Sequence, residues 1–135
     1  MKEALTKIVA TIGPASEKKE IIEQMARGGV DVFRLNLKHS SPNWHFKMIK
    51  KIRKVSFEIK KPVAILLDVP EKLKFRKNFL FSLVDYIAVS FTQSKRDIEK
   101  FRKIVPSWVK IVAKIEDQKG IKNFDNILAS ADGIM

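Results

Sequence analysis

The chain has 135 residues, of which 45% are hydrophobic, and it contains no cysteine. This length and composition suit one globular domain with its own core, and the lack of thiols excludes disulfides, thiolate metal sites and cysteine nucleophiles. No stretch approaches the roughly 18 consecutive apolar residues of a membrane span, and the first residues lead directly into a strand-like segment without a signal peptide. We therefore expect a cytoplasmic enzyme or binding protein with no membrane partner.

The net charge is +12, from 27 Lys and Arg against 15 Asp and Glu. A charge of this size attracts polyanions such as nucleic acid, and also small phosphorylated metabolites. The lysines are spread along the chain, however, with no interleaved aromatic platform, whereas a dedicated nucleic-acid site usually gathers its basic residues on one face. We expect a lysine-rich solvated surface rather than a nucleic-acid partner, with RNA binding driven by the charge as the alternative.

Six short runs rich in apolar and β-branched residues predict six strands. Four of these runs are almost continuously apolar, which is typical of strands covered on both faces in a parallel sheet. In chain order, the predicted strands are 7–12, 30–37, 62–68, 86–91, 109–115 and 131–135.

The first two intervals between strands have the apolar period of a helix. We expect one helix to follow Ser16 as its N-cap and to end at the glycine pair 28–29. A second should begin at Ser41, with Pro42 in its first turn, and end before Pro62.

The later intervals are also helical in period, although the segments are shorter. A brief stretch surrounds residues 79–83, and a further helix should open at Ser94 and stop before Pro106. A last helix should follow Gly120 and carry an apolar stripe of Ile121, Ile127 and Leu128.

Strand and helix therefore alternate along the chain, which predicts right-handed βαβ crossovers and a parallel sheet of the α/β class. Two architectures fit this pattern, an open doubly wound sheet and a (β/α) barrel. No G-x-G-x-x-G or G-x-x-x-x-G-K-[ST] loop follows a strand, which disfavours a nucleotide-binding open sheet.

In either architecture ligands bind at the carboxyl ends of the strands, so polar residues at these ends are the candidates for a site. Arginine makes bidentate contacts with phosphate, lysine contributes a point charge, and a carboxylate offers a hard oxygen to Mg²⁺. Their convergence would suit a phosphorylated substrate and a divalent ion. The candidates are Arg34, Asn36 and Lys38 on one face of the second strand, Asp68 after the third, and Lys114 and Glu116 on one face of the fifth.

Each of these residues also has a simpler interpretation. A single Lys or Glu at a strand end is commonly solvated, and Asp68, which stands two residues before a proline, could be only a turn residue. His39 could belong to the loop that caps the following helix.

Seven segments resemble, in unbroken order, the barrel of the pyruvate kinase family. The first resembles the family's opening strand and turn, the second its R-L-N-F-S-H-G segment, the fourth its D-x-I-A-x-S-F strand, and the last three its A-K-I-E to S-D-G-I-M stretch. The segments are TKIVATIGPAS at 6–16, RLNLKH at 34–39, AILLD at 64–68, DYIAVSF at 85–91, AKIE at 113–116, GIKNFD at 120–125 and DGIM at 132–135.

The resemblance implies a (β/α)₈ barrel of the TIM type, with six of eight βα units in residues 1–135 and without the lid and C-terminal domains. It implies phosphoryl transfer between phosphoenolpyruvate and ADP, giving pyruvate and ATP in glycolysis. Lys114 would stabilise the transferring phosphoryl group and the enolate, and Arg34 would bind the phosphoryl group. The alternative is a non-catalytic paralogue that binds phosphometabolites or proteins.

The family's cofactors are Mg²⁺ and usually K⁺. The resemblance implies that Glu116 is one of two acidic Mg²⁺ ligands, that Asn36 and Asp68 bind K⁺, and that His39, with Asn36, lies where substrate and nucleotide bind. Lys38 replaces a serine that would bind K⁺, so its ammonium could make that ion dispensable; a decayed site is the alternative.

Other differences from the family concern parts of the site and of the fold that residues 1–135 lack or replace. The family's second Mg²⁺ carboxylate follows the D-G-I-M segment, a short connection between Asp68 and Asp85 replaces the lid, and Val69 replaces a threonine expected to help hold K⁺. We therefore expect these 135 residues alone to be inactive as a kinase. An open six-unit barrel should form an oligomer or be completed by a missing C-terminal portion.

Overall fold

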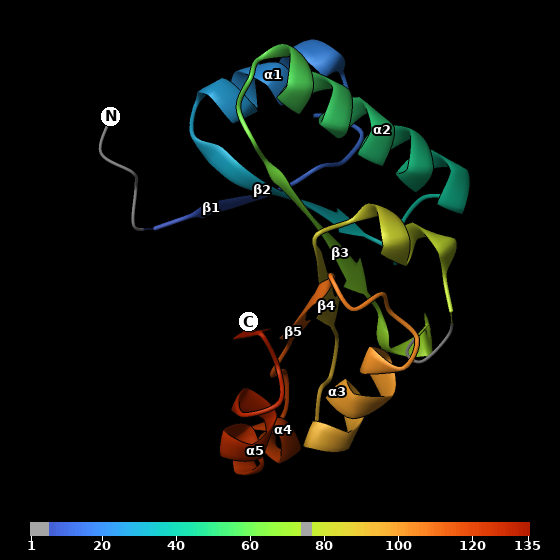
Figure 1. The fold of residues 1–135 in the computed structure, drawn as a ribbon, viewed down its shortest axis with the longest axis vertical. Helices are drawn as coiled ribbons and strands as arrows, with labels where there is room; N and C mark the ends of the chain where they lie inside the picture. Colours follow the sequence, from blue (N-terminus) through green and yellow to red (C-terminus); the bar gives the residue numbers. More distant parts are fainter. Residues whose placement is uncertain (1–5, 74–76) are drawn as a thin grey trace.

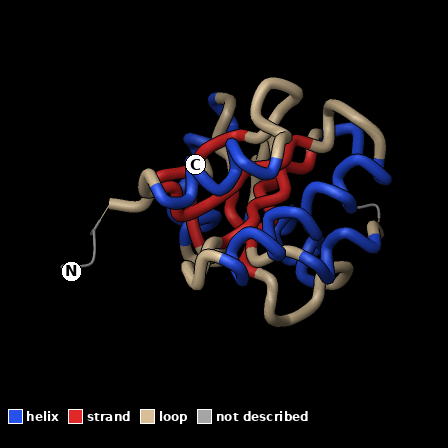
Figure 2. The backbone as a smooth tube through the Cα atoms, turned by 90° about the horizontal axis from the view of Figure 1, so that it is seen from above, coloured by secondary structure: helices blue, strands red, loops and turns tan. Residues whose placement is uncertain are grey.

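Six parallel strands form one sheet, in which the spatial order follows the order along the chain. The computed structural model describes residues 6–73 and 77–135, and its sheet curls into half of a barrel (Figures 1 and 2). The prediction of an α/β fold of the (β/α)₈ type is thus confirmed as a partial barrel. The strands are β1 (Ile8–Thr11), β2 (Val30–Asn36), β3 (Ala64–Val69), β4 (Tyr86–Val89), β5 (Lys110–Ala113) and β6 (Gly133–Ile134).

Helices connect successive strands, as the alternating pattern predicts. In the described residues these are α1 (Lys19–Arg27), α2 (Pro42–Glu58), α3 (Lys95–Arg102), α4 (Gln118–Lys122) and α5 (Phe124–Leu128), with short 3₁₀ helices η1 (Glu71–Leu73) and η2 (Phe79–Leu83) between β3 and β4. Within the described ranges, none of these helices is long and apolar enough to cross a membrane.

The strands present alternate residues to two separate clusters. The outer face meets the helices and holds the larger core, which includes Phe33, Leu35 and Leu67 from the strands and Ile52 from α2. The inner face holds a smaller cluster of Leu66, Ala88 and Val112, with Val32 and Tyr86 packed against it. Because the strands are in register, the polar residues that follow this inner cluster reach one end of the half-barrel together.

Two of the predicted helix starts are confirmed. The Ser41 side chain accepts a hydrogen bond from the Trp44 amide at 3.2 Å, and a proline stands in the first turn of α2. Ser94 forms a capping box with Asp97 at the start of α3. Both motifs satisfy amide groups that the first turn of a helix leaves unpaired.

Two other expectations about helices are wrong. Ser16 is not an N-cap, because its hydroxyl bonds to the backbone of Gly13 in a turn and α1 begins after Lys18. Gly120 lies inside α4 rather than before a helix, and its amide is capped by Asp117 at 2.8 Å. A Cβ at this position would lie 2.8 Å from the Thr92 carbonyl oxygen, so close packing of α4 against the β4–α3 loop requires a glycine.

The expected apolar stripe on the last helix is also only partly present. The segment is split into α4 and α5 at Asn123, and of the three predicted residues only Ile127 is buried. Ile121 and Leu128 are exposed, because two five-residue helices do not keep the single face that one continuous helix would present to the sheet.

Candidate active site

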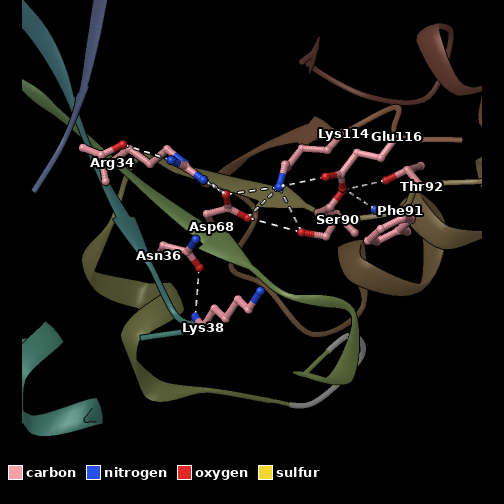
Figure 3. A network of polar contacts seen from close by, with 11 residues as sticks. Arg34, Asn36, Lys38, Asp68, Ser90, Phe91, Thr92, Lys114 and Glu116 are labelled. Atoms are coloured by element: carbon pink, nitrogen blue, oxygen red, sulfur yellow. Dashed lines mark hydrogen bonds and ion pairs between the residues drawn. The ribbon is translucent and has the colours of Figure 1, made fainter. Parts of the chain in front are cut away.

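The polar residues predicted at the strand ends lie side by side on the inner face. Asn36 pairs in register with Asp68 across β2 and β3, and Arg34 stands two residues earlier on the same face of β2. Ser90 and Lys114 follow β4 and β5, and their amides bond to the Val69 and Val89 carbonyls and extend the sheet by one residue. The curl of the sheet turns these side chains toward one another (Figure 3).

Asp68 is the centre of this group and is almost fully buried, with 1% of its surface exposed. Its Oδ2 accepts hydrogen bonds from Arg34 Nη2 at 2.6 Å and Nε at 3.0 Å. Lys114 Nζ lies 3.2 Å from the same oxygen and 3.3 Å from Oδ1. One buried carboxylate therefore holds two cations in a fixed relation to each other.

Two hydroxyl groups complete the arrangement. Ser90 Oγ accepts from Lys114 Nζ at 3.1 Å and donates to Asp68 Oδ1 at 3.3 Å. Thr11 Oγ1, at the end of β1, accepts from Arg34 Nη1 at 2.9 Å. These side chains fix the directions of the arginine fork and the ammonium group. Thr11 and Ser90 both lie in segments that resemble the family, but the sequence predicts no site role for either. A hydroxyl group at the end of an apolar strand is the feature of the sequence that could have indicated one.

Glu116 lies at the opposite side of Lys114 from Asp68. Its Oε2 accepts from the Phe91 amide at 2.9 Å, and its Oε1 is 3.5 Å from Lys114 Nζ. Phe91 has a φ of 48°, a left-handed conformation that is uncommon for a bulky residue. This backbone directs the amide at the carboxylate, so local strain at Phe91 helps to position Glu116.

Two cavities adjoin the group and divide the predicted residues between them. The first, of about 390 Å³, is lined by Asp68, Lys114 and Glu116, with Lys38 also on its wall. The second, of about 310 Å³, is lined by residues that include Arg34, His39, Thr11 and Trp44. Asn36 lines both. Arg34 and His39 thus face a different cavity from Lys114 and Glu116.

Two predicted residues make contacts that bear on ion binding. The Oδ1 atom of Asn36 accepts from the Lys38 amide at 2.9 Å, so the amide oxygen already has a donor. Within residues 6–73 and 77–135, the Lys38 ammonium forms no ion pair and its side chain extends beside the first cavity (Figure 3). The same described part of the chain contains no group of three or more His, Asp or Glu side chains arranged to hold a metal ion.

The loops that carry Phe91 and Glu116 are joined by polar contacts outside the cavity. Gln93 donates to Asp117, and Asn123 donates to the Gln93 carbonyl at 2.8 Å. The bond from Gln93, followed by that from the Gly120 amide, lowers the pKa of Asp117 below its ordinary value. The β4–α3 and β5–α4 loops are consequently held in a fixed relation at the rim of the site.

Comparison with known proteins shows which family the chain resembles. The family model described as "Pyruvate kinase, barrel domain" matches residues 3–79 and 70–135. A pyruvate kinase of Staphylococcus saprophyticus is 41% identical over 101 residues, which cover 71% of this chain and 17% of that relative. Pyruvate kinase 2 of Synechocystis is 47% identical over 64 residues, covering 47% of the chain and 11% of the relative. The chain thus spans at most 17% of the curated relatives named here.

Proposed function

Because the chain belongs to the pyruvate kinase family, we propose that it forms part of a phosphotransferase that moves a phosphoryl group between phosphoenolpyruvate and ADP, giving pyruvate and ATP in glycolysis. The observation that carries this proposal is the pair of cations, Arg34 and Lys114, held on one buried carboxylate, Asp68, with Lys114 at one cavity and Arg34 at the neighbouring one. Phosphoryl transfer is catalysed mainly by positioning and by neutralising charge, and this arrangement supplies both.

Lys114 has the central role in this proposal. In the forward direction, the phosphorus–oxygen bond of phosphoenolpyruvate breaks, a new one forms to the terminal phosphate oxygen of ADP, and negative charge passes to the enolate oxygen. The Lys114 ammonium lines the cavity and is 14% exposed, so it can meet that charge. Arg34 would bind the phosphoryl group, and Asp68 and Ser90 would orient Lys114. Asn36 and His39, at the second cavity, would contact substrate or nucleotide.

Mg²⁺ would require Glu116. This carboxylate lies on the wall of the first cavity and is partly exposed, so its oxygens fit a hard divalent cation. Asp68 is already engaged by two cations and is a poor second ligand. When bound, Mg²⁺ would neutralise negative charge on the phosphate groups of phosphoenolpyruvate and ADP. Glu71 also lines this cavity, but the described residues contain no group of three or more side chains arranged to hold a metal ion. They would therefore hold Mg²⁺ weakly, which supports our expectation that these 135 residues have no turnover by themselves.

K⁺ fits the described residues poorly. The two proposed ligands are Asn36 and Asp68, yet the first accepts from the Lys38 amide and the second is neutralised by Arg34 and Lys114. A univalent cation would add to an existing excess of positive charge. These contacts support a site that does not depend on K⁺. The proposal that the Lys38 ammonium replaces the ion is supported by its place on the wall of the same cavity as Asn36 and Asp68. Turnover by a protein containing this segment should be the same with K⁺ and with a large organic cation; a strong increase with K⁺ would contradict the proposal.

The direct test is binding of phosphoenolpyruvate to the chain, measured by titration calorimetry with Mg²⁺ present. Lys114→Met should weaken binding by at least about tenfold, since one charge-assisted contact is lost. Lys110→Met is the matched control, because Lys110 is an exposed lysine at the other end of β5, and it should change affinity by less than about twofold. Equal effects of the two substitutions would refute the proposed site.

The alternative, a phosphometabolite-binding module without catalysis, is favoured because the described residues contain no group of three or more side chains arranged to hold a metal ion. This alternative predicts the same binding of phosphoenolpyruvate, but no phosphoryl transfer when the rest of a barrel is supplied as a separate polypeptide.

The proposed partners also include such a polypeptide or further copies of the chain. β1 and β6 are the edge strands of the sheet, and the exposed Ile8 and Val9 lie on β1.

A further inference from the structure

The outer surface of α2 carries a row of lysines between aromatic side chains. Phe46, Lys50, Lys54 and Phe57 occupy positions i, i+4, i+8 and i+11 of the helix, so they lie within a narrow arc on its surface. The two phenylalanines are separated by roughly 16 Å along the axis, at 1.5 Å per residue. The opposite side of α2, with Met48, Ile49, Ile52 and Val55, is buried against the sheet.

A second segment adds to this row. η2 lies beside the first turns of α2 (Figure 1), and its Phe79 ring meets that of Phe46 with centroids 5.9 Å apart. Lys50 Nζ lies 5.4 Å from the centroid of the Phe46 ring, within reach of a cation–π contact. We call Phe46, Lys47, Lys50, Lys54, Phe57 and Phe79 together the α2 ridge.

Two rings of the α2 ridge are unusually open to solvent for phenylalanine. Phe57 is 85% exposed and Phe79 is 60% exposed. They lie at opposite ends of the ridge, since Phe79 contacts Phe46 and Phe57 is in the last turn of α2. Leaving these rings in water forgoes the free energy that burial would give, so a surface that covered both rings would gain it.

The charge of the ridge is almost uncompensated. Lys47, Lys50 and Lys54 are all exposed, and the only acid of α2 is Glu58. That carboxylate is engaged by Lys19 at 2.7 Å and is 3.9 Å from Lys54. The Lys19 contact is the main cause of the lowered pKa of Glu58. The ridge therefore presents exposed cations and apolar rings on one convex surface.

This arrangement corrects the expectation that no aromatic platform is interleaved with the lysines. In the linear sequence Phe57 and Phe79 are far apart, and neither is next to Lys50. The helical period brings Phe46 and Phe57 into line with the lysines, and the fold brings η2 against α2. Phe46 and Phe57 already stand among the lysines in the sequence, but the fold is needed to align them and to add Phe79.

We propose that the α2 ridge docks on the surface of a lipid bilayer that contains anionic phospholipids. Lysines at such a surface keep their ammonium groups among the head groups, while the neighbouring rings enter the boundary of the acyl chains. A bilayer can cover the widely spaced rings and the cations together. Peripheral docking of this kind needs no membrane-spanning helix.

The spacing disfavours single-stranded nucleic acid as the occupant. Proteins that bind single strands stack successive bases on neighbouring aromatic rings in a groove. Here the two open rings are separated by most of the length of a convex helix, and the Phe46 ring, at the start of the row of lysines, is contacted by Phe79 and Lys50. Docking through α2, on the outer side of the sheet, would leave the cavities at the strand ends accessible, so this inference does not depend on the proposed function.

Sedimentation of the chain with lipid vesicles tests the proposal. We expect binding to phosphatidylcholine vesicles that contain about 30 mol% phosphatidylserine, weak binding to phosphatidylcholine alone, and release at about 1 M salt. The triple variant Lys47→Gln, Lys50→Gln, Lys54→Gln should lower vesicle affinity by at least about tenfold. The matched control, Lys95→Gln, Lys119→Gln, Lys122→Gln, removes the same net charge from other exposed lysines and should lower it by less than about threefold.

A second pair of variants separates ring insertion from general charge. Phe57→Ser with Phe79→Ser should weaken vesicle binding several-fold at unchanged net charge, whereas Trp108→Ser with Ile121→Ser, at exposed apolar residues elsewhere, should not. Circular dichroism checks that each variant is folded. Equal losses in the two lysine triples, no effect of the phenylalanine pair, or tight binding to a single-stranded oligonucleotide with none to vesicles would each overturn the proposal.

Discussion

The outer and inner faces of the sheet are made from alternate residues of the same strands, yet they differ in composition and in what they can do. On β3, Leu67 is fully buried under the helices, while its neighbours Leu66 and Asp68 point into the half-barrel. The outer face is a continuous apolar core. The inner face has a small apolar cluster at mid-strand and charged groups at the strand ends.

The difference shows that the alternation of residues along each strand places the stabilising apolar side chains on one face and the candidate ligand-binding side chains on the other. Helices cover the outer face and remove it from water, so its side chains contribute hydrophobic free energy. The inner face is covered only in part, and its buried charges are acceptable because they are paired with one another. Substitutions on the two faces should therefore have unequal effects on stability and on ligand binding.

The largest expected effect on stability comes from a matched pair of neighbours on β3. Leu67→Ala should lower the free energy of unfolding by about 4 kcal/mol, because it leaves a cavity in the main core. Leu66→Ala should lower it by only about 2 kcal/mol, because its cluster is small and borders an open face. Urea denaturation followed by circular dichroism measures both; equal losses would contradict the proposed division between the faces.

A smaller loss is expected at the charged end of the inner face. Asp68→Asn should cost about 2 kcal/mol, because Arg34 and Lys114 lose their shared partner but, at 26% and 14% exposure, can recruit water. Asp85→Asn, at a more exposed pair with Arg53, should cost about 1 kcal/mol. The same denaturation experiment compares the two variants. A larger loss of unfolding free energy in Asp85→Asn would contradict the expectation that the buried carboxylate of Asp68 contributes more to stability.

The helix layer over the outer face can be weakened at its cap. Ser41→Ala removes the bond to the Trp44 amide and should cost about 1 kcal/mol. Asn43→Ala, two residues later in α2, should be close to neutral because alanine favours the helix. Neither substitution should alter phosphoenolpyruvate affinity, and an effect of Ser41→Ala on that affinity would mean that the two faces are coupled.

The smallest effect is a dependence of stability on pH that arises in the outer core. Burial lowers the pKa of His45 from its ordinary value of 6.5, against the opposing bond between Nε2 and the His39 carbonyl. Since Nε2 bonds to a carbonyl oxygen, Nδ1 carries the lone pair, and among the described residues it has no partner.

Because the folded state binds the proton of His45 less tightly than the unfolded state, stability should be full above pH 6.5 and fall as the pH is lowered through the depressed pKa. Denaturation curves collected from pH 7.5 to 5 would measure this slope. It should disappear in His45→Phe, whatever that substitution does to the absolute stability, and an unchanged slope would contradict the assignment.

The number and order of the strands and the parallel sheet could be predicted from the sequence. So could the gathering of polar residues at one edge, namely Arg34, Asn36, Asp68, Lys114 and Glu116. Alternation along a strand and the common direction of parallel strands are local rules, so they can be applied to residues without coordinates. Ser41 and Ser94 were predicted as caps for the same reason, since a cap is specified within a few residues.

Which side chains satisfy one another could be known only from the three-dimensional fold. Four contacts join segments that are distant in sequence: the pairing of Arg34 and Lys114 on Asp68, the Phe91 amide on Glu116, the close approach at Gly120, and the Phe79 ring against Phe46. Such contacts depend on the curl of the sheet and on how helices pack against it, and neither is encoded in a local pattern.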